Sequence, residues 1–181
     1  MVVATKGGAV LRHASDEDLE AIDELTVESY RPIFESYLSM LGEDCYEAVR
    51  LEPGLTWKQR KTQQNRRLYD EHPTQLWVLE ENGDVFGFVS FWLFRDSSYG
   101  HIDNNGVRAD RVGQGWATFM YRHVLDHFRE LGLRFAHVDT GLDDAHIPAR
   151  RAYEATGFDR QVPTVEYWQD LSLRNPGSTL A

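Results

Sequence analysis

The run Val107-Arg108-Ala109-Asp110-Arg111-Val112-Gly113-Gln114-Gly115-Trp116-Ala117 joins the end of a strand to the start of a helix. Its two glycines, one residue apart, let the backbone turn tightly and let a ligand approach without obstruction by a Cβ atom. The first N–H groups of a helix have no partner within the helix, and the helix dipole favours an anion beside them. The junction therefore predicts a phosphate-binding loop, although Gly-x-Gly before a helix also occurs as plain loop geometry.

The spacing of the glycines excludes two common nucleotide-binding patterns. The loop has neither Gly-x-x-x-x-Gly-Lys-Ser/Thr nor Gly-x-Gly-x-x-Gly, which disfavours a nucleoside triphosphatase and a dinucleotide-dependent enzyme. After the loop, apolar residues recur every three or four positions from Trp116 to Leu131, and Gly132 closes this predicted amphipathic helix. Further downstream we expect a strand over 134–139, a helix over 148–156 and a last strand over 162–173.

Upstream of the loop the pattern changes to that of strands. Residues 75–80 and 84–93 are rich in β-branched and aromatic side chains, and Glu81-Asn82-Gly83 between them predicts a hairpin. A third strand is expected over 99–107. A first strand over 9–14 precedes a helix that Ser15 caps, which runs to Leu41.

Two details of the helical regions are also predicted. Pro32 is expected to divide the first helix. A helix over 55–71 carries a basic side that we interpret as a solvated surface. The order of elements predicts an α+β fold, a mixed and mostly antiparallel sheet with helices on both faces.

Length and composition predict one domain over 9–173, with flexible termini at 1–8 and 174–181. The formal net charge of −10 argues against a nucleic-acid partner and fits a cationic one. The single cysteine, Cys45, excludes an intrachain disulfide and a thiolate zinc cage. The apolar run 85–94 is half of the ~20 residues that a bilayer span needs, and no signal peptide is recognisable, so a cytoplasmic location is expected.

The two glycines and a second motif resemble the GNAT superfamily of acyl-CoA-dependent N-acetyltransferases. The loop is similar to that family's Arg/Gln-x-x-Gly-x-Gly/Ala, with Val112 where Arg or Gln is usual. Residues 146–158 resemble the family's Asn-x-x-Ala-x-x-x-Tyr-x-x-x-Gly-Phe, with His146 in place of Asn. Residues 140–150 match Thr-Gly-x-Asp-x-x-His-x-Pro-Ala-Arg, which indicates a sub-branch. The resemblance covers roughly residues 9–173 and implies two central strands, 99–107 and 134–140, that splay apart.

The resemblance also implies a cofactor site and a region for the acceptor. Acetyl-CoA would bind as co-substrate, its pyrophosphate held mainly by backbone N–H groups of the loop, and no metal is expected. The region from Pro32 to His72 would shape the acceptor pocket. The implied cofactor-binding residues are Val107, Arg108, Val112, Gly113, Gln114, Gly115, Trp116, Ala117 and Ala149.

Acetyl transfer to nitrogen needs a group that takes a proton from the acceptor amine and a group that assists the departing thiolate. Tyr153 matches the family tyrosine that serves the leaving sulfur, although it could equally be a core aromatic. Asp103 stands where many relatives carry a strand glutamate that acts as base. Asp139 and His146 are its rivals, and each could instead cap a neighbouring helix.

The sequence thus predicts an N-acetyltransferase that acts on an amine of a cationic small molecule or peptide. A non-catalytic acyl-CoA-binding module is one alternative. A zinc hydrolase is another, since His123 and His127 are spaced as metal ligands on one helix, but a third ligand is missing from the motif. No nucleic-acid or membrane partner is expected, and an exposed final strand favours a homodimer.

Overall fold

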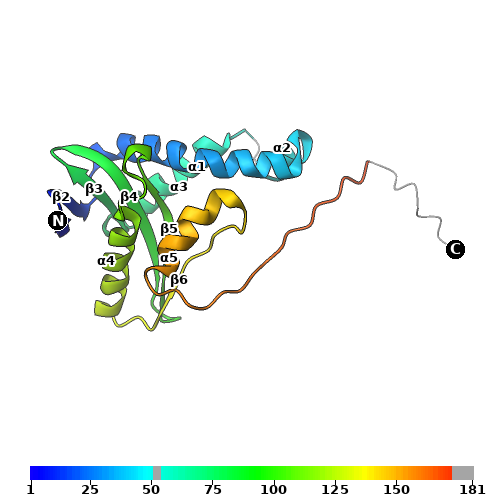
Figure 1. Cartoon of the computed structure of the whole chain (residues 1–181). Coiled ribbons are helices and arrows are strands. Elements are labelled where there is room, and N and C mark those ends of the chain that lie inside the picture. Colours follow the sequence, from blue (N-terminus) through cyan, green and yellow to red (C-terminus); the bar gives the residue numbers. More distant parts are fainter. Residues whose placement is uncertain (51–53, 173–181) are drawn as a thin grey trace.

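The computed structural model describes residues 1–50 and 54–172, and Figure 1 shows one sheet with helices on both of its faces. The sheet has six strands in the order of the chain, and only the last pair is parallel. None of the helices in the described ranges is long and apolar enough to cross a membrane. The strands are β1 (Val2–Lys6), β2 (Ala9–His13), β3 (Leu76–Glu81), β4 (Asp84–Phe94), β5 (Tyr99–Val107) and β6 (Phe135–His137).

Two layers of helices bury the two faces of the sheet. On one face α4 and α5 cover a core that contains Phe86, Phe91 and Ile102. On the other face α1 and α3 cover a smaller core around Val78 and Phe88. The helices are α1 (Leu19–Leu41), α2 (Glu43–Arg50), α3 (Trp57–Glu71), α4 (Trp116–Glu130) and α5 (Ile147–Glu154), with short 3₁₀ turns at Asp16–Asp18, Pro73–Gln75, Ala109–Arg111 and Asp144–His146. The α+β prediction is confirmed.

The turns behave as their residue types require. Asn82 and Gly83 join β3 to β4 with φ values of 54° and 84°, the two successive positive values of a tight hairpin turn. Gly42 ends α1 with φ 74°, as the sequence predicts. Ser15 forms a capping box with Asp18 before α1 begins.

Two predictions about the ends of the chain need correction, and a third concerns residues outside the described ranges. Residues 2–6, expected within a flexible terminus, form β1 and pair antiparallel with β2, because Gly7 and Gly8 adopt the positive φ of a hairpin. The expected last strand is absent over 162–172, which have no strand pairing with the described sheet. Residues 173–181, which include the predicted flexible C-terminus, lie outside the described residues.

Pro32 does not divide α1, which runs unbroken from Leu19 to Leu41. A proline inside a helix removes one hydrogen bond and costs roughly 3 kcal/mol. Burial on both sides of Pro32 offsets that cost. Leu25 lies before it in the core with the sheet, and Phe34 lies after it, stacked on Trp57 of α3 with ring centroids 4.4 Å apart.

A β-bulge in β5 reverses the direction of its side chains. Phe91 of β4 pairs with Ile102, but Val89 pairs with Asn105, so Asp103 and Asn104 together stand opposite Ser90. The Ser90 hydroxyl fills the extra space, since it donates to the Asn104 carbonyl at 3.0 Å and accepts from the Asn104 N–H at 2.9 Å. Bulges re-aim side chains and are common beside active sites.

The parallel pairing of β5 with β6 is short. It comprises three residue pairs and ends at His101 and His137, whereas β5 continues to Val107. The observed β6 is thus shorter than the strand predicted over 134–139. Strands β5 and β6 separate immediately before the bulge, so the splayed strands that the resemblance implies are confirmed.

Close packing at Gly100 gives a stability prediction. A Cβ atom there would lie 2.4 Å from the Phe128 ring of α4. Gly100→Ala should lower the free energy of unfolding by about 1–3 kcal/mol, because an overpacked core must shift. The measurement is urea unfolding of the wild type, both single variants and Gly100→Ala/Phe128→Leu. The alanine should cost clearly less in the Phe128→Leu background than beside the native ring, and an equal cost in both backgrounds would contradict the contact.

Candidate active site

The bulge in β5 sends two asparagines to opposite faces of the sheet. On one face the side-chain oxygen of Asn104 accepts from the Tyr30 hydroxyl of α1 at 3.0 Å and from Lys61 Nζ of α3 at 2.8 Å. On the other face the Asn105 oxygen accepts from the Tyr121 hydroxyl of α4 at 2.6 Å. Four helices and the central strand therefore meet through polar groups here, since α5 adds Tyr153 to the second face.

Asp103 lies at the same bulge, and two N–H groups hold its carboxylate. The Trp92 indole donates to Asp103 Oδ2 at 3.1 Å, and the Asn104 amide donates to the same oxygen at 3.5 Å. Lys61 and Tyr30 orient the Asn104 amide by occupying its oxygen. Asp103 is thus positioned by a chain of hydrogen bonds that begins on α1 and α3.

The interpretation of the basic side of α3 as a solvated surface is wrong for Lys61. Its ammonium lies 4.4 Å from the centroid of the Tyr30 ring, and burial lowers the pKa of Lys61. A solvated surface describes neighbours such as Lys58, which is exposed. Nothing in the sequence distinguishes Lys61 from them, because only the packing of α3 against α1 selects the residue that faces inward.

Tyr153 is buried, with 6% of its surface exposed, and its hydroxyl remains in the polar network. The Asn105 amide donates to that hydroxyl at 3.4 Å, and the Tyr121 ring lies 5.0 Å away, centroid to centroid. Burial raises the pKa of Tyr153, so the hydroxyl keeps its proton at neutral pH. The ring packs in the core while the hydroxyl faces the Asn105 amide.

His101, His137 and Asp139 gather where β5 and β6 part. The two Nδ1 atoms of the histidines are 2.7 Å apart, and His101 Nε2 lies 3.6 Å from Asp139. Neighbouring positions on parallel strands, paired in register, bring the two rings together. Burial lowers the pKa of His101, whereas the negative charges of Asp103 and Asp139 act in the opposite direction. The sequence analysis missed both His101 and His137.

The glycine loop forms an open cradle at the start of α4. Gly113 and Gly115 have φ values of 82° and 78°, and Gly115 is the N-cap of the helix. A Cβ atom at Gly113 would meet nothing within 4 Å, so the space in front of the loop is free. The first turn of α4 contains no acidic residue, and its first N–H groups face a site suited to an anion. The loop fits a pyrophosphate.

Lys6 of β1 brings a cation to this cradle. Its ammonium donates to the carbonyl oxygens of Gln114 and Gly115 at 3.3 and 3.5 Å, and it lies 4.5 Å from the centroid of the Trp116 ring. The sequence analysis missed Lys6 because it assigned residues 1–8 to a flexible terminus. The signal was present as Val2-Val3-Ala4-Thr5, a short β-prone run before two glycines.

Comparison with known proteins assigns the family. The sequence model of the acetyltransferase (GNAT) family matches residues 36–158. The chain belongs to the GNAT acetyltransferase family.

Individual relatives are more distant than the family match. The uncharacterized N-acetyltransferase YsnE of Bacillus subtilis (strain 168) is 27% identical over 75 residues, which cover 41% of this chain and 50% of that protein. The match thus spans about half the length of this curated relative. The crystal structure of a predicted acetyltransferase from Clostridium acetobutylicum with acetyl-CoA superimposes with a TM-score of 0.55 at 16% identity, covering 88% of this chain and 95% of the other.

A second solved structure with the same fold is that of a named acetyltransferase. The aminoglycoside acetyltransferase meta-AAC0020, from an uncultured soil metagenomic sample and in complex with sisomicin, has a TM-score of 0.56 at 12% identity. The alignment covers 91% of this chain and 97% of that one. At these identities the likeness to solved structures shows the GNAT fold alone.

The other residues that the GNAT resemblance implied for cofactor binding have varied environments. Arg108 is engaged in ion pairs with Asp84 and Asp110, at 2.8 and 2.9 Å. Trp116 is buried with its ring 5.1 Å from Phe86, so only its backbone can serve a ligand. Val112 is exposed at the loop, and the side chains of Val107, Ala117 and Ala149 pack against the core, whereas Gln114 accepts from the Trp116 indole.

His146 lies in a separate cluster from the groups at the bulge. Its ring contacts the Asp143 carboxylate, which also accepts from the Ser36 hydroxyl at 2.7 Å. The carboxylate lies between Ser36 and His146, so this is not a nucleophilic triad, in which the histidine is central. The contact anchors the loop before α5, and the structure does not bring His146 to Tyr153 or Asp103 by any described hydrogen bond.

A metal site at His123 and His127 finds no support in the described residues. The only group of three metal-ligand side chains within reach of one another there is His101, His137 and Asp139. Nitrogen ligands of a tetrahedral zinc ion, each ~2.0–2.1 Å from the metal, would stand farther apart than the 2.7 Å between the two Nδ1 atoms. In the arrangement observed, the two imidazoles share a hydrogen bond between their Nδ1 atoms.

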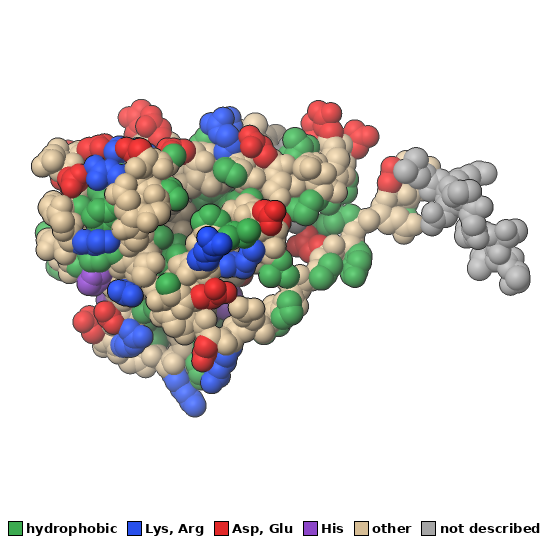
Figure 2. Space-filling view, in the orientation of Figure 1, with side chains coloured by type: hydrophobic (Ala, Val, Ile, Leu, Met, Phe, Trp, Pro, Cys, Tyr) green, Lys and Arg blue, Asp and Glu red, His purple; other side chains and the backbone are tan. Residues whose placement is uncertain are grey.

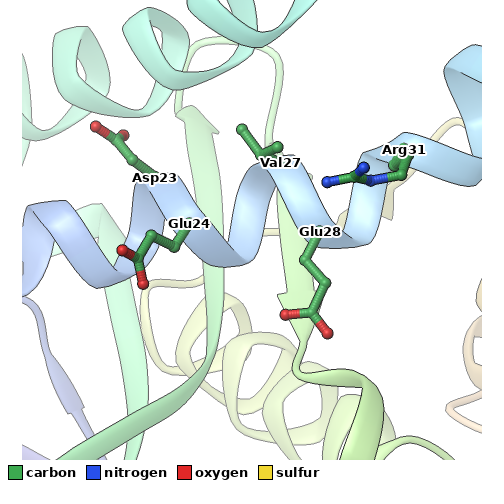
Figure 3. Close-up of a pocket in the computed structure, with 5 residues that line it drawn as sticks. All are labelled: Asp23, Glu24, Val27, Glu28 and Arg31. Atoms are coloured by element: carbon green, nitrogen blue, oxygen red, sulfur yellow. The ribbon is translucent and has the colours of Figure 1, made fainter.

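A groove of about 500 Å³ runs along the outer side of α1. Figure 3 shows that its five labelled side chains all come from this helix and point in different directions, so they do not converge on a ligand. Two of them are already engaged elsewhere. Asp23 pairs with Arg66 at 2.6 Å, and Glu28 accepts from the Ala109 N–H at 2.8 Å. The groove is therefore structural surface, away from the bulge.

Burial of His101 predicts a pH dependence of stability. Burial lowers the pKa of His101 below its ordinary value of ~6.5. As the pH falls below ~6.5, the unfolded chain binds a proton that the folded chain does not, so stability decreases with pH until the folded-state pKa is passed. Between pH 6.5 and 5.5, His101→Asn should flatten this fall by up to about 1.4 kcal/mol per pH unit.

Urea unfolding at closely spaced pH values measures this slope. His123→Asn on the outer part of α4 is the matched control, because it removes one histidine away from the bulge. An identical slope in wild type and His101→Asn would contradict the assignment.

Proposed function

We propose that this chain transfers an acetyl group from acetyl-CoA to an amine. The observation that carries the proposal is the arrangement along β5. A polar bulge that joins Asp103, Asn105 and Tyr153 lies where β5 and β6 part, and the same strand leads into the glycine cradle. Family membership supports the reaction type, and bulge and cradle supply the groups that it requires.

The cofactor would be held at the start of α4. Backbone N–H groups of Gly113, Gln114 and Gly115 and of the first helical turn would bind the pyrophosphate, and Lys6 would add a positive charge. Acetyl-CoA supplies the activated acetyl thioester. We infer that the thioester would lie between β5 and β6 beside the bulge, where it and the amine would be held together.

The acceptor amine must lose a proton before it attacks. We assign this task to the carboxylates Asp103 and Asp139 together with His101, which lies 3.6 Å from Asp139. Because burial lowers the pKa of His101, its imidazole is neutral and able to accept a proton at pH 7. This neutral base suits an alkylammonium better than an exposed carboxylate, since a carboxylate ordinarily titrates near pH ~4.

The departing thiolate needs stabilisation on the other face of the strand. The Tyr153 hydroxyl would donate a hydrogen bond to the sulfur while the Asn105 amide donates to the tyrosine oxygen. Burial raises the pKa of Tyr153 above ~10, whereas a thiol titrates near ~8.5. Full proton transfer from Tyr153 is therefore uphill, and a hydrogen bond is its main contribution.

Residues 140–150 support the narrower sub-branch of the family. The motif residues form one hydrogen-bonded loop, in which Arg150 donates to the carbonyls of Gly141 and Asp143 at 2.6 and 2.9 Å. A Cβ atom at Gly141 would lie 2.5 Å from both Asp143 and His146, so only glycine fits. The motif therefore acts as a structural unit that joins β6 to α5.

We propose a cationic acceptor, such as a polyamine, an aminoglycoside-like molecule or a peptide amine. Asp103 and Asp139 face the point where the amine would enter, and the chain is acidic overall. Release of free thiol in the presence of a panel of such amines tests the proposal. Cofactor binding without amine-dependent release would instead indicate a non-catalytic acyl-CoA-binding module.

Binding of CoA gives the first test of the cradle. CoA at a hundredfold excess over its Kd should stabilise the chain by about 2.7 kcal/mol, seen as a rise in Tm. Lys6→Met should weaken binding about tenfold, the effect of losing one charge-assisted contact. Lys58→Met is the matched control, since it removes an exposed lysine elsewhere. No rise in Tm with millimolar CoA would exclude the cradle.

Gly115→Val extends this test by closing the cradle. The positive φ of Gly115 means that valine will also lower the Tm of the free chain, so the readout is the shift that CoA causes in each variant. The CoA-dependent shift should vanish. A shift equal to that of wild type would show that the loop does not hold the pyrophosphate.

Tyr153→Phe tests the chemical step, because it deletes the hydroxyl and keeps the ring. We expect kcat to fall by about 10²-fold, the lower end for a group that assists proton transfer, with little change in the Kd for CoA. Tyr99→Phe, at the other end of β5, is the control and should keep the wild-type kcat. An unchanged kcat with a lower Tm would assign Tyr153 to the core alone.

A further inference from the structure

Lysine is rare in this chain, and one of its lysines lies at the bulge. The sequence contains three lysines, Lys6, Lys58 and Lys61. Figure 2 shows that the basic side chains of the visible face stand at the surface among acidic ones, which is the ordinary place for a lysine. Lys6 contacts the cradle and Lys58 is exposed. Lys61 is half-buried, with its ammonium against the Tyr30 ring of α1.

The side chain of Lys61 reaches from α3 to the polar end of β5. Its ammonium donates to the side-chain oxygen of Asn104 at 2.8 Å, and the Asn104 amide donates to Asp103 Oδ2 at 3.5 Å. One amide group therefore separates the lysine nitrogen from a carboxylate that we assign to the acceptor amine. Strands β5 and β6 have already parted here, since their pairing ends before Asp103. The lysine nitrogen thus approaches the bulge from the face opposite to Tyr153.

The surroundings of Lys61 favour its neutral, nucleophilic form. Its ammonium donates to the amide oxygen of Asn104 rather than to a carboxylate. Burial lowers the pKa of Lys61, the negative charges of Asp103 and Asp139 oppose this effect only in part, and the positive charge of Arg60 adds to it. At neutral pH a larger fraction of Lys61 is therefore neutral than of an exposed lysine, and only the neutral amine can attack a carbonyl carbon.

We propose that Lys61 is itself an acetyl acceptor, modified by the acetyl-CoA that the same chain binds. The inference rests on the proposed function, which puts the thioester between β5 and β6 beside the bulge. Tyr153 would then lie on one face of the acetyl group and Lys61 on the other. The bound thioester would therefore have an amine beside it even when no substrate is present.

The transfer is balanced between the lysine and acetyl-CoA. The Lys61 ammonium first loses one proton to solvent. Its nitrogen then attacks the thioester carbonyl carbon, so that a C–N bond forms and the C–S bond breaks. A second proton on nitrogen passes to the departing thiolate, which leaves as CoA thiol. The acetylated lysine keeps one N–H for Asn104 but has lost its positive charge.

Mass-spectrometric mapping of acetyl groups tests the inference on the full chain. The wild type is incubated with saturating acetyl-CoA and no added amine, then digested, and the acetylated fraction of each lysine is followed in time. Lys61 should react at least about tenfold faster than Lys58, because a bound thioester acts at a high effective concentration. Excess CoA should suppress the reaction at Lys61, and dilution of the protein should leave its rate unchanged. Equal rates at the two lysines, or a rate at Lys61 that falls in proportion to protein concentration, overturn the proposal.

Two matched variants identify the site by the mass of the intact chain. Lys61→Arg keeps a positive charge and a donor for Asn104, but its guanidinium stays protonated and does not accept the acetyl group. Lys58→Arg makes the same exchange at an exposed position. The Lys58→Arg chain should gain one acetyl group in the time that leaves Lys61→Arg unmodified. Equal modification of both variants contradicts the assignment.

Two parallel measurements separate this inference from the proposed function. The CoA-dependent rise in Tm and the release of thiol with added amines are recorded on the same preparation. Thiol release with amines but no acetylation of Lys61 overturns this inference alone and leaves the proposed function standing. A chain with neither a rise in Tm nor thiol release overturns both.

Discussion

The site depends on one irregularity in the sheet, the pairing of a single serine with two residues of β5. Ser90 satisfies both the N–H and the carbonyl of Asn104, so the extra residue costs no buried unpaired backbone group. Without this bulge, Asn104 would keep the alternation of the strand and Asn105 would face away from Tyr153. The bulge therefore decides which asparagine meets which helical layer: Asn104 faces α1 and α3, and Asn105 faces α4 and α5.

A buried cation is part of the same arrangement. Lys61 satisfies its ammonium through the Asn104 oxygen and the face of Tyr30 rather than through an ion pair with a carboxylate among the described residues. The half-buried ammonium thereby holds the side-chain oxygen of Asn104 in place. That amide in turn fixes Asp103. Contacts on one side of the sheet thus help to orient a carboxylate where β5 and β6 part.

Local chemistry explains what the sequence could predict. The Asn82-Gly83 turn, the limits of β5, the period of α4 and the glycine loop all follow from residue types and spacing, and the structure agrees. The run Asp103-Asn104-Asn105 predicted polar residues facing a cleft. It did not predict that the two asparagines face opposite sides of the sheet in this order, because a bulge depends on the partner strand. Lys6, His101 and Lys61 were missed because contacts between distant segments select them. The prediction of a final strand was wrong for a related reason, because a segment with β-prone residues forms a strand only where a neighbouring strand pairs with it.

The position of Lys6 places the first strand directly against the glycine cradle. Its ammonium touches the cradle 108 and 109 residues further along the chain, and the Met1 carbonyl accepts from His13 to hold β1 in place. Any additional residues fused ahead of Val2, such as a purification tag, would begin next to this strand. Affinities obtained with a tag at this end would report the tag as well as the protein.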